Sequence, residues 1–264
     1  MKPFLKWAGS KYKIIDKIKN SLPQGKRLIE PFVGSGSVFL NTNYQEYLCI
    51  DKNADLINLF KILQKDGIDF IEYARQFFTD YNNEEAFYKL RDEFNHSVDI
   101  YKKSAIFIYL NRHCFNGLCR YNLKGGFNVP FCRYKSPLFP QKEMQYFYTK
   151  SQNVDFIHAD FSYIKNLAKN DDVIYCDPPY IALNQTSNFT SYTQNGFDID
   201  DQIELSELAL YLQQKGIPVI ISNHDTIFTR EIYKNAIISA FEVQRFIAAS
   251  ASNRNKAPEL LAIF

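Results

Sequence analysis

Long hydrophobic runs are missing from this 264-residue sequence. No stretch approaches the roughly eighteen uncharged apolar residues that a membrane-spanning helix requires, and residues Met1 to Trp7 lack the apolar core of a secretory signal peptide. We therefore expect a cytoplasmic protein without a membrane partner.

Cysteine is scarce: there are five residues, an odd number that follows no disulfide framework. This usage fits a reducing compartment. His113, Cys114, Cys119 and Cys132 could be imagined as zinc ligands, but their spacing matches no standard zinc pattern, so we expect no metal site.

A strong charge of either sign is also absent, because 31 basic and 29 acidic residues give a formal net charge of +2. That balance neither requires nor excludes a nucleic-acid partner. Between Arg112 and Lys135, however, every charged residue is basic, and aromatic residues stand between them. Basic groups can bind phosphates while rings stack or wedge, so this segment is a candidate DNA-binding surface. The alternative is a solvated hairpin with a partly buried aromatic face.

Apolar residues make up 46% of the chain, enough for a large folded core. Residues 56–111 have helical periodicity, and residues 118–134 predict a β-hairpin with its turn at Lys124-Gly125-Gly126. This part interrupts an α/β pattern. The other expected elements are a helix over 14–22, strands over 27–32, 47–50, 154–158 and 173–176, a helix over 200–214, a strand over 217–222, a helix over 226–233, and strands near 241–247 and 259–264.

The motif Asp177-Pro178-Pro179-Tyr180 directly follows the expected strand 173–176. Ligands of open α/β sheets bind beyond the carboxyl ends of strands, and two prolines stop the strand and stiffen the turn. A carboxylate, a carbonyl and a flat ring in one stiff turn suit a planar base that carries an amino group. A solvent-exposed turn with a proline stop is the alternative for so short a motif.

Two glycines, Gly34 and Gly36, follow the first expected strand and Phe32, and we expect a helix after them. Without β-carbons there, a ligand can approach the backbone, and Asp51 at the end of the second strand can bind the hydroxyls of an adenosine ribose. A dinucleotide oxidoreductase would need a third glycine where Phe39 stands. A structural turn without a ligand is the other alternative.

Together, a ribose-binding acid, a glycine turn and an amine-accepting turn indicate transfer of a methyl group from S-adenosylmethionine to an exocyclic amine. Hydrogen bonds from that amine to Asp177 and to a carbonyl, for which we name Pro178, would favour a pyramidal nitrogen whose lone pair points at the methyl carbon. No covalent enzyme intermediate or metal ion is needed. A base in duplex DNA must first be flipped out, and Tyr180 can then stack on it.

With these residues in view, the sequence resembles the Dam family of bacterial DNA adenine methyltransferases over nearly its whole length. The order of cofactor motif, recognition insert and catalytic motif is that of the α class of amino-methyltransferases. The resemblance is carried by residues 4–11 (FLKWAGSK), 30–41, 116–122 (NGLCRYN), 127–131 (FNVPF), 177–180 (DPPY) and 221–225 (ISNHD).

The resemblance implies an α/β fold with a mixed seven-stranded sheet. It places the catalytic domain in residues 1–55 and 145–264 and a helical and β-hairpin DNA-recognition subdomain in residues 56–144. It implies methylation of adenine N6, commonly within the palindrome GATC, by a monomer that binds double-stranded DNA at the nucleoid. Replication, mismatch repair and restriction–modification are the processes to which it links such a mark.

Matching positions complete the set of expected site residues. The cofactor-binding residues are Trp7, Lys11, Phe32, Gly34, Gly36, Asp51, Asp160, Phe161 and Asp177. The catalytic residues are Asp177, Pro178 and Tyr180. The DNA-binding residues are Lys6 and Arg120, which match readers of base edges, Leu118 and Pro130, which match apolar base contacts, Phe115 in the place of an intercalating tyrosine, and Asn116, Arg133 and Tyr134. Lys135 is at most a phosphate contact.

The sequence departs from the family pattern at Ser10, which replaces a usual glycine, at Phe115, which lacks the tyrosine hydroxyl, and at Pro258. The change at Ser10 bears on cofactor affinity, and the change at Phe115 bears on a phosphate contact. Neither changes the chemistry of methyl transfer. Methylation of the cytosine amine is an alternative, which Asp177 disfavours because enzymes of that type more often have serine there. A DNA-binding module without catalysis is another.

Some residues also have simpler interpretations. Trp7 could be a core aromatic residue. Asn223 or Asp225 could cap the helix that follows the strand over 217–222, and we assign His224 no role.

Overall fold

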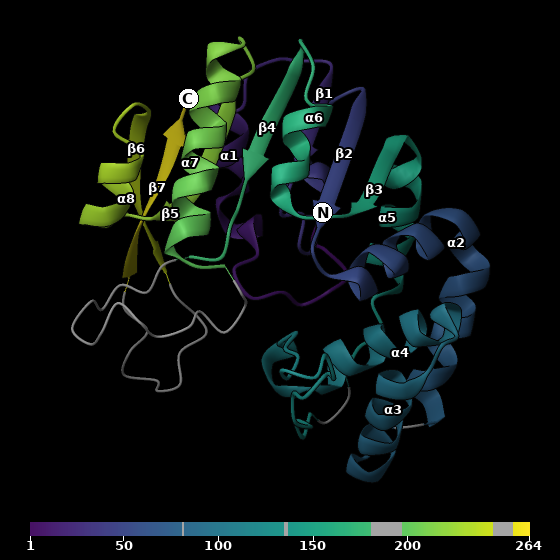
Figure 1. The fold of residues 1–264 in the computed structure, drawn as a ribbon. Coiled ribbons are helices and arrows are strands. Elements are labelled where there is room, and N and C mark those ends of the chain that lie inside the picture. Colours follow the sequence, from purple (N-terminus) through teal and green to yellow (C-terminus); the bar gives the residue numbers. More distant parts are fainter. Residues whose placement is uncertain (81, 135–136, 181–196, 245–255) are drawn as a thin grey trace. The chain divides into compact units, whose positions relative to one another are not determined.

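The computed structural model describes residues 1–80, 82–134, 137–180, 197–244 and 256–264. The chain forms two compact units (Figure 1). The first unit holds residues 1–13, 34–41 and 53–158, and the second holds residues 14–33, 42–52 and 159–264. The expected recognition subdomain, residues 56–144, falls within the first unit, and its functional boundaries stay a prediction.

Seven strands form one mixed sheet in the order β3-β2-β1-β4-β5-β7-β6, which confirms the predicted seven-stranded sheet. β1 pairs in parallel with β2 and β4, β4 pairs in parallel with β5, and β7 pairs antiparallel with β5 and β6. The strands are β1 (Arg27–Glu30), β2 (Glu46–Asp51), β3 (Val154–His158), β4 (Asp172–Cys176), β5 (Val219–His224), β6 (Ile237–Gln244) and β7 (Lys256–Ile263).

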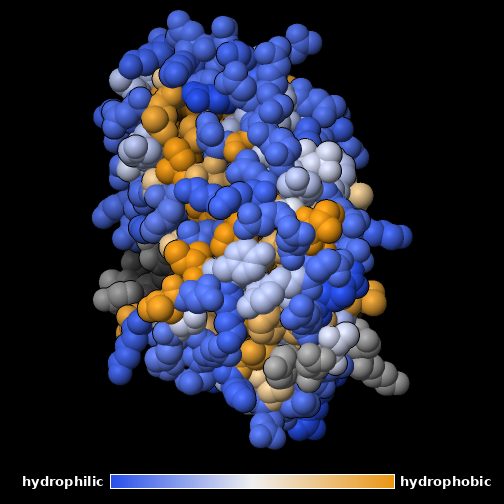
Figure 2. All heavy atoms as spheres, turned by 90° about the vertical axis from the view of Figure 1, so that its right-hand side faces the viewer, coloured by the Kyte–Doolittle hydropathy of each residue, from blue (hydrophilic) through white to orange (hydrophobic). Residues whose placement is uncertain are grey.

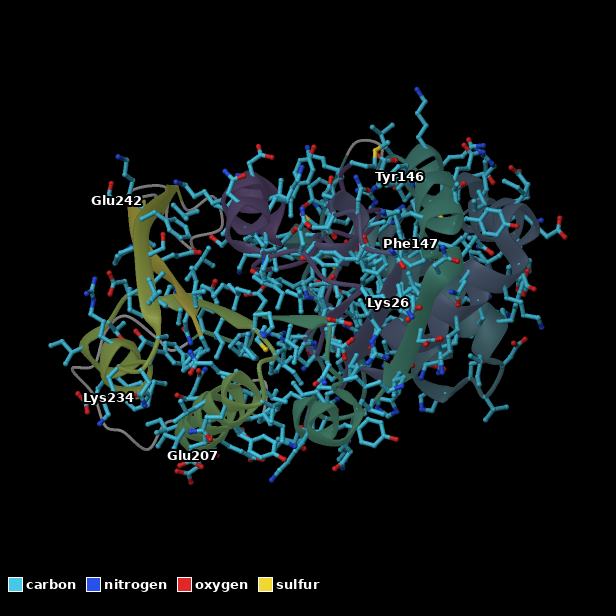
Figure 3. The ribbon with its side chains drawn as sticks, turned by 90° about the horizontal axis from the view of Figure 1, so that it is seen from above. Lys26, Tyr146, Phe147, Glu207, Lys234 and Glu242 are labelled. Carbon is cyan, nitrogen blue, oxygen red and sulfur yellow. The ribbon has the colours of Figure 1, made fainter. Side chains whose placement is uncertain are left out.

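The central strands of the second unit are apolar because both faces of a parallel sheet are covered. All residues of β4 are buried, and Ile174 in β4 lies between Ile29 of β1 and Val219 of β5. At the opposite end of the strands, Lys26, labelled in Figure 3, pairs with Glu46 at 2.8 Å. Packing of β4 in the core therefore fixes the end of this strand and the position of Asp177 directly after it.

Two helices of the second unit, α7 and α8, begin with side-chain caps. Asp198 and Asp201 form a capping box at the start of α7, and Thr226 and Thr229 form one at the start of α8. The predicted cap of α8 is therefore wrong, because Asp225 instead pairs with Arg230 at 2.6 Å. The helices of the second unit are α1 (Ile15–Ser21) and α6 (Ile164–Leu167), which have no side-chain cap among the described residues, and α7 (Ile199–Gln214) and α8 (Ile227–Ile232).

The first unit is built from helices around an aromatic core. The rings of Phe60 and Phe147 lie 4.7 Å apart, and Phe4, Phe39 and Phe156 contact Phe147 at centroid distances of 5.2 to 5.8 Å. Figure 3 labels Phe147 and its neighbour Tyr146. The helices are α2 (Ala54–Asp80), interrupted at Gly67, α3 (Glu84–His96), α4 (Ile100–His113) and α5 (Gln141–Lys150). They confirm the predicted helical segment, to which α5 is an unpredicted addition.

Apolar side chains also reach the surface, among them Val98, Ile100 and Leu123. Figure 2 shows one face of the molecule, on which hydrophobic side chains lie among hydrophilic ones. Such exposure is ordinary for a folded protein. No helix among the described residues is long and apolar enough to cross a membrane.

Three local predictions need correction. The predicted helix after Gly36 is only the 3-10 helix Phe39–Asn41, because β2 begins at Glu46 and leaves too little chain for an α-helix. β6 begins at Ile237 rather than near residue 241, and residues 245–247 of that prediction lie outside the described residues. The predicted hairpin has isolated antiparallel bridges, Cys114 with Phe131 and Tyr121 with Phe127, instead of regular strands.

Candidate functional site

Asp177 lies directly beyond the carboxyl end of β4. Ser222, fully buried in the neighbouring strand β5, donates from Oγ to Asp177 Oδ1 at 2.9 Å. Tyr175 in β4 in turn donates from its hydroxyl to Ser222 Oγ at 3.0 Å. Ser222 Oγ, itself bonded by the Tyr175 hydroxyl, therefore orients the Asp177 carboxylate.

The two prolines after Asp177 are held by a buried amide. Gln202 in α7, which is 1% exposed, donates from Nε2 to the carbonyl of Pro179 at 2.8 Å. Its Oε1 accepts from Asn223 Nδ2 in β5 at 3.0 Å. The turn is therefore attached to both a helix and a strand, which fixes the backbone around buried Pro178.

Tyr180 is held at both its hydroxyl and its ring. The hydroxyl donates to Glu259 Oε2 in β7 at 3.4 Å, and the ring meets His224 edge to face, with centroids 4.7 Å apart and planes at 74°. Burial, reinforced by the charge of Asp177, raises the pKa of Tyr180 well above its ordinary value, so the phenol is neutral. The result is a neutral aromatic ring beside Asp177 with a defined plane.

The backbone brings two further acidic residues, Asp51 and Asp160, near each other in the second unit. Asp51 ends β2, and its carbonyl accepts from the amide of Ala159, next to Asp160. Burial alone would raise the pKa of Asp160, but hydrogen bonds from the amide and hydroxyl of Ser162 and the nearby ammonium of Lys52 lower it below its ordinary value. Asp160 is therefore ionised at neutral pH.

Phe32, which follows β1, and Phe161, which follows Asp160, bring two predicted cofactor residues into contact. Their rings stack with centroids 5.5 Å apart and planes at 23°. Phe197 meets both rings at 5.5 Å. These three aromatic rings form an apolar cluster in the second unit.

Trp7 and Gly34 meet in the first unit. A β-carbon at residue 34 would stand 2.8 Å from Trp7 Nε1, and Gly34 has a φ of +47°. Glycine is therefore required both for the turn and for the ring beside it. Lys11, 6% exposed, donates from Nζ to the Gly9 carbonyl at 2.8 Å. Ser10, the departure from the family pattern, joins its hydroxyl to that of Ser37 at 2.7 Å and so ties this segment to the glycine turn.

The predicted cofactor residues are distributed over the two units. Those of the first unit are Trp7, Lys11, Gly34 and Gly36. Those of the second unit are Phe32, Asp51, Asp160, Phe161 and Asp177. The described residues contain no group of three or more His, Cys, Asp or Glu side chains that could hold a metal ion.

Five predicted DNA-binding residues form one cluster in the first unit, which we call the recognition cluster: Lys6, Phe115, Asn116, Pro130 and Tyr134. Lys6 Nζ lies 4.3 Å above the Tyr134 ring, and the Tyr134 hydroxyl accepts from the Asn116 amide at 3.3 Å. The Phe115 amide donates to the Pro130 carbonyl at 3.0 Å, while the Phe115 ring is 49% exposed. Burial and the charge of Arg112 lower the pKa of Lys6. The cluster thus presents an ammonium and an uncovered ring on one backbone frame.

Leu118 extends the recognition cluster along the chain. Its amide donates to the Phe115 carbonyl at 3.1 Å, and its carbonyl accepts from Cys114 Sγ at 3.3 Å. The predicted apolar base contact is therefore joined to the turn that carries Phe115.

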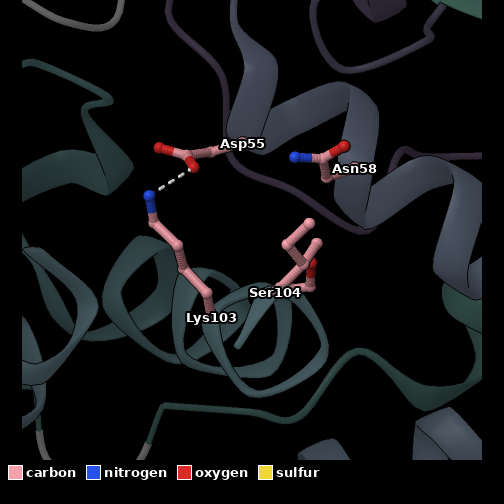
Figure 4. A pocket seen from close by; sticks show the side chains of 5 residues that line it. Asp55, Asn58, Lys103 and Ser104 are labelled. Atoms are coloured by element: carbon pink, nitrogen blue, oxygen red, sulfur yellow. Dashed lines mark ion pairs between the residues drawn. The ribbon is translucent and has the colours of Figure 1, made fainter. Parts of the chain in front are cut away.

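Arg120 lies farther along the segment and is oriented by Asn128, which faces it across the turn. Its Nε donates to Asn128 Oδ1 at 2.7 Å, and the Asn128 amide donates to the Arg120 carbonyl at 3.1 Å. The next residue, Tyr121, donates to Asp55 Oδ2 at 2.9 Å. Asp55 also pairs with Lys103 at 2.8 Å in the small pocket of Figure 4. These contacts anchor the hairpin to α2 and α4.

Arg133 makes an exposed ion pair with Glu84 of α3 at 3.3 Å. An exposed pair of this kind contributes little stability, so Arg133 can exchange its partner. Lys135, the predicted phosphate contact, lies outside the described residues.

Several residues of the site were not predicted. Ser222, Gln202, Glu259 and His224 contact the Asp177–Tyr180 turn, and Asn111 bonds the backbone of the recognition cluster. Their signal in the sequence was weak because each acts on a partner far along the chain: Ser222 and Asp177 are 45 residues apart, and Tyr180 and Glu259 are 79 apart. A polar residue inside an apolar strand, as in Ile221-Ser222-Asn223, was one sign, and the place of these residues in the family resemblance was another.

Comparison with known proteins identifies relatives over most of the chain. A family model described as D12 class N6 adenine-specific DNA methyltransferase matches residues 7–247. The chain is 49% identical to a DNA adenine methylase of Serratia marcescens over 263 residues, covering 99% of this chain and 97% of that protein. It is 48% identical to a DNA adenine methylase of Escherichia coli (strain K12) over 264 residues, covering 99% and 94%. A DNA adenine methylase of Vibrio cholerae (strain ATCC 39541) is 48% identical over 263 residues, covering 99% and 95%.

Proposed function

Because this chain belongs to the D12 class of N6 adenine-specific DNA methyltransferases, we propose that it methylates the N6 amine of adenine within GATC, with S-adenosylmethionine as the donor. The enzyme class follows from the family. The donor, the GATC target and a flipped target base are the parts that we add.

The observation that carries this proposal is the orientation of Asp177 by Ser222 at the end of β4 (2.9 Å). A carboxylate in a fixed orientation can accept a hydrogen bond from the adenine amine, and the carbonyl of Pro178 is the second acceptor in the turn. Two acceptors draw the amine hydrogens to one side and leave the nitrogen lone pair on the other. Such positioning is the main contribution needed from the enzyme.

Tyr180 supplies the surface on which the flipped base rests. Its ring plane is fixed by His224 and by the hydroxyl contact to Glu259. Base flipping exposes both faces of adenine, and stacking on an aromatic ring recovers part of the stacking lost in the duplex. The ring and the carboxylate are three residues apart in one stiff turn, so base and amine are located together.

The residues in each unit fit S-adenosylmethionine. Gly34 lets the Trp7 ring lie against the backbone of the glycine turn, Asp51 is a carboxylate suited to ribose hydroxyls, and ionised Asp160 beside Phe161 offers an acceptor and a ring for adenine. When bound, S-adenosylmethionine supplies a methyl group already activated by the sulfonium charge. The binding residues therefore need only hold and orient it.

The recognition cluster and Arg120 support reading of a short duplex site. Arginine and lysine bind guanine O6 and N7 in the major groove, and apolar side chains such as Leu118 and Pro130 contact the thymine methyl group. These are the chemical features that GATC offers. We propose that the enzyme acts as a monomer on double-stranded DNA, and hence in the cytoplasm at the nucleoid.

The test is methyl transfer from labelled S-adenosylmethionine to duplexes that contain GATC or a site with one base pair replaced. Digestion of the product to nucleosides should give N6-methyl-2′-deoxyadenosine. N4-methylcytosine would instead support the cytosine alternative, and DNA binding without transfer would support a module that has lost catalysis. Transfer to the altered sites at the GATC rate would contradict the proposed target.

A further inference from the structure

Asn111, in the last turn of α4, is the buried centre of the recognition cluster. Its side chain is 1% exposed. Oδ1 accepts from the Lys6 amide at 2.8 Å, and Nδ2 donates to the Lys6 carbonyl at 2.7 Å and to the Gly117 carbonyl at 3.1 Å. One amide thus bonds both backbone groups of Lys6 and a carbonyl in the turn that carries Phe115.

The two segments joined by Asn111 are also in close steric contact. A β-carbon at residue 117 would stand 2.3 Å from Lys6 Cβ, and Gly117 has a φ of +66°. The Lys6 stem therefore rests on the Gly117 backbone. Any change in the spacing that Asn111 sets would move the Lys6 ammonium relative to the Tyr134 ring on which it lies.

We propose that Asn111 is a positioning residue for DNA reading: it fixes the Lys6 segment against the Phe115–Gly117 turn, so that the base-reading ammonium and the intercalating ring keep one separation. The inference rests on the proposed function, because it assigns DNA roles to Lys6 and Phe115. Asn111 itself is buried and acts through the backbone of the residues that touch DNA.

A purely structural role would predict that loss of Asn111 lowers stability and slows methylation of every duplex by one factor. Positioning predicts a selective loss. Lysine and phenylalanine can still bind phosphate and wedge from displaced positions, but a base-edge contact requires donor and acceptor to meet within hydrogen-bond distance. Discrimination between sites should therefore fall more than activity on GATC.

Asn111→Asp is the informative variant because it keeps the shape and the acceptor for the Lys6 amide. It removes both donations from Nδ2 and places an oxygen against the carbonyls of Lys6 and Gly117. Methylation rates are measured at fixed salt on GATC and on duplexes with each base pair replaced in turn. We expect discrimination at the position that Lys6 reads to fall about tenfold, or 1.4 kcal/mol, with a smaller fall in the rate on GATC.

Gln64→Leu is the matched control. Gln64 is also an amide that donates from Nε2 to two carbonyls of the first unit, those of Ser151 and Val154, but it contacts no member of the recognition cluster in the described residues. Its loss should reduce thermal stability with discrimination unchanged. A control that lost discrimination as Asn111→Asp does would overturn the proposal.

A double-mutant cycle with Lys6→Ala decides whether Asn111 acts through Lys6. Lys6→Ala should relax one position of the site, and adding Asn111→Asp should then change discrimination at that position less than about twofold. Equal tenfold losses in both backgrounds would overturn the positioning role. Unchanged site discrimination in Lys6→Ala would also overturn the positioning role. The proposed function is judged separately: it stands if the wild-type enzyme methylates adenine in GATC, and it fails if the enzyme does not.

Two measurements keep the inference testable if Asn111→Asp does not fold. Asn111→Ser, which is smaller and neutral, enters the same cycle. In the wild-type protein, hydrogen exchange at the Lys6 amide should be slow, because that amide donates to buried Asn111. Exchange at the rate of an unstructured amide would overturn the proposal without any variant.

Discussion

The two units hold their predicted functional side chains in different ways. In the second unit the side chains themselves are held: Ser222 bonds the carboxylate of Asp177, and Glu259 and His224 contact Tyr180. In the first unit the backbone is held, by Asn111, while Phe115 remains half exposed. In the proposed mechanism, methyl transfer depends on one orientation of a carboxylate, whereas the proposed DNA surface must adapt its side chains to a partner. Rigid side chains would serve the first task and a rigid backbone the second.

The largest effect should come from removing the rigid carboxylate. Asp177→Ala should lower the rate of methyl transfer about 100- to 1,000-fold, because the amine loses a positioned acceptor. The measurement is single-turnover transfer of labelled methyl groups to GATC duplex, with circular dichroism to confirm folding. A folded variant with near-normal turnover would remove Asp177 from the chemistry.

The first unit contains a buried base that should make its fold sensitive to acid. His113 is 1% exposed, stacks on Tyr109, and burial lowers its pKa from 6.5 to about 4. Below pH 6.5 the unfolded chain binds a proton that the folded chain does not. Stability should therefore fall as the pH drops from 6.5 to 4, by about 3 kcal/mol in total.

Urea unfolding at several pH values measures this effect. His113→Phe should reduce the fall in stability between pH 6.5 and 4. His96→Gln, which removes an exposed histidine of α3, is the control for the loss of an imidazole. The same pH dependence in wild type and His113→Phe would contradict the assignment.

Arg120 tests the proposed reading function of the first unit away from the recognition cluster. Arg120→Ala should lower discrimination at one guanine-containing position by about 1 to 3 kcal/mol and leave the target adenine obligatory. Lys124→Ala, at the exposed tip of the same hairpin, is the control and should at most weaken binding to all duplexes alike, with a smaller salt dependence. If Arg120→Ala lowered the methylation rate on every site by the same factor, Arg120 would not read a base.

Ser222→Ala should have the smallest effect of these variants, and it tests whether the two units hold their side chains differently. It removes one hydrogen bond to the Asp177 carboxylate, and we expect kcat to fall about tenfold with the KM for DNA unchanged. Asn111→Asp, by contrast, should change discrimination. Steady-state kinetics on GATC and altered duplexes separates the two patterns, and a Ser222→Ala enzyme with altered site preference would erase the distinction between the units.

The sequence was sufficient for elements with a strong apolar pattern and for motifs confined to a few adjacent residues. β4 and the position of Asp177 follow from Val173 to Cys176 and the prolines after them. Helix α5 was missed because its first residues, Gln141 to Glu143, are polar and follow Pro140, and only Met144 and Phe147 are buried.

Supporting residues were harder to predict because their partners are distant in the chain. Asn111 reads as one polar residue at the end of an apolar helix, and its bonds to Lys6 span 105 residues. The caps of α8 were misplaced by a few residues because Asn223, Asp225 and Thr226 are all capable of capping, and only the backbone geometry selects Thr226.

The division of the chain has a consequence for synthesis on the ribosome. The chain passes between the units after residues 13, 33, 41, 52 and 158, so no single cut releases either unit as a continuous fragment.

The order of the last strands also matters during synthesis. β7 lies between β5 and β6, and β6 has no described strand on its other side. β6 can therefore join the sheet only after residues 256–263 have emerged from the ribosome. A truncated product that ends before them would leave β5 and β6 without their shared partner β7, and these unpaired strand edges would favour aggregation.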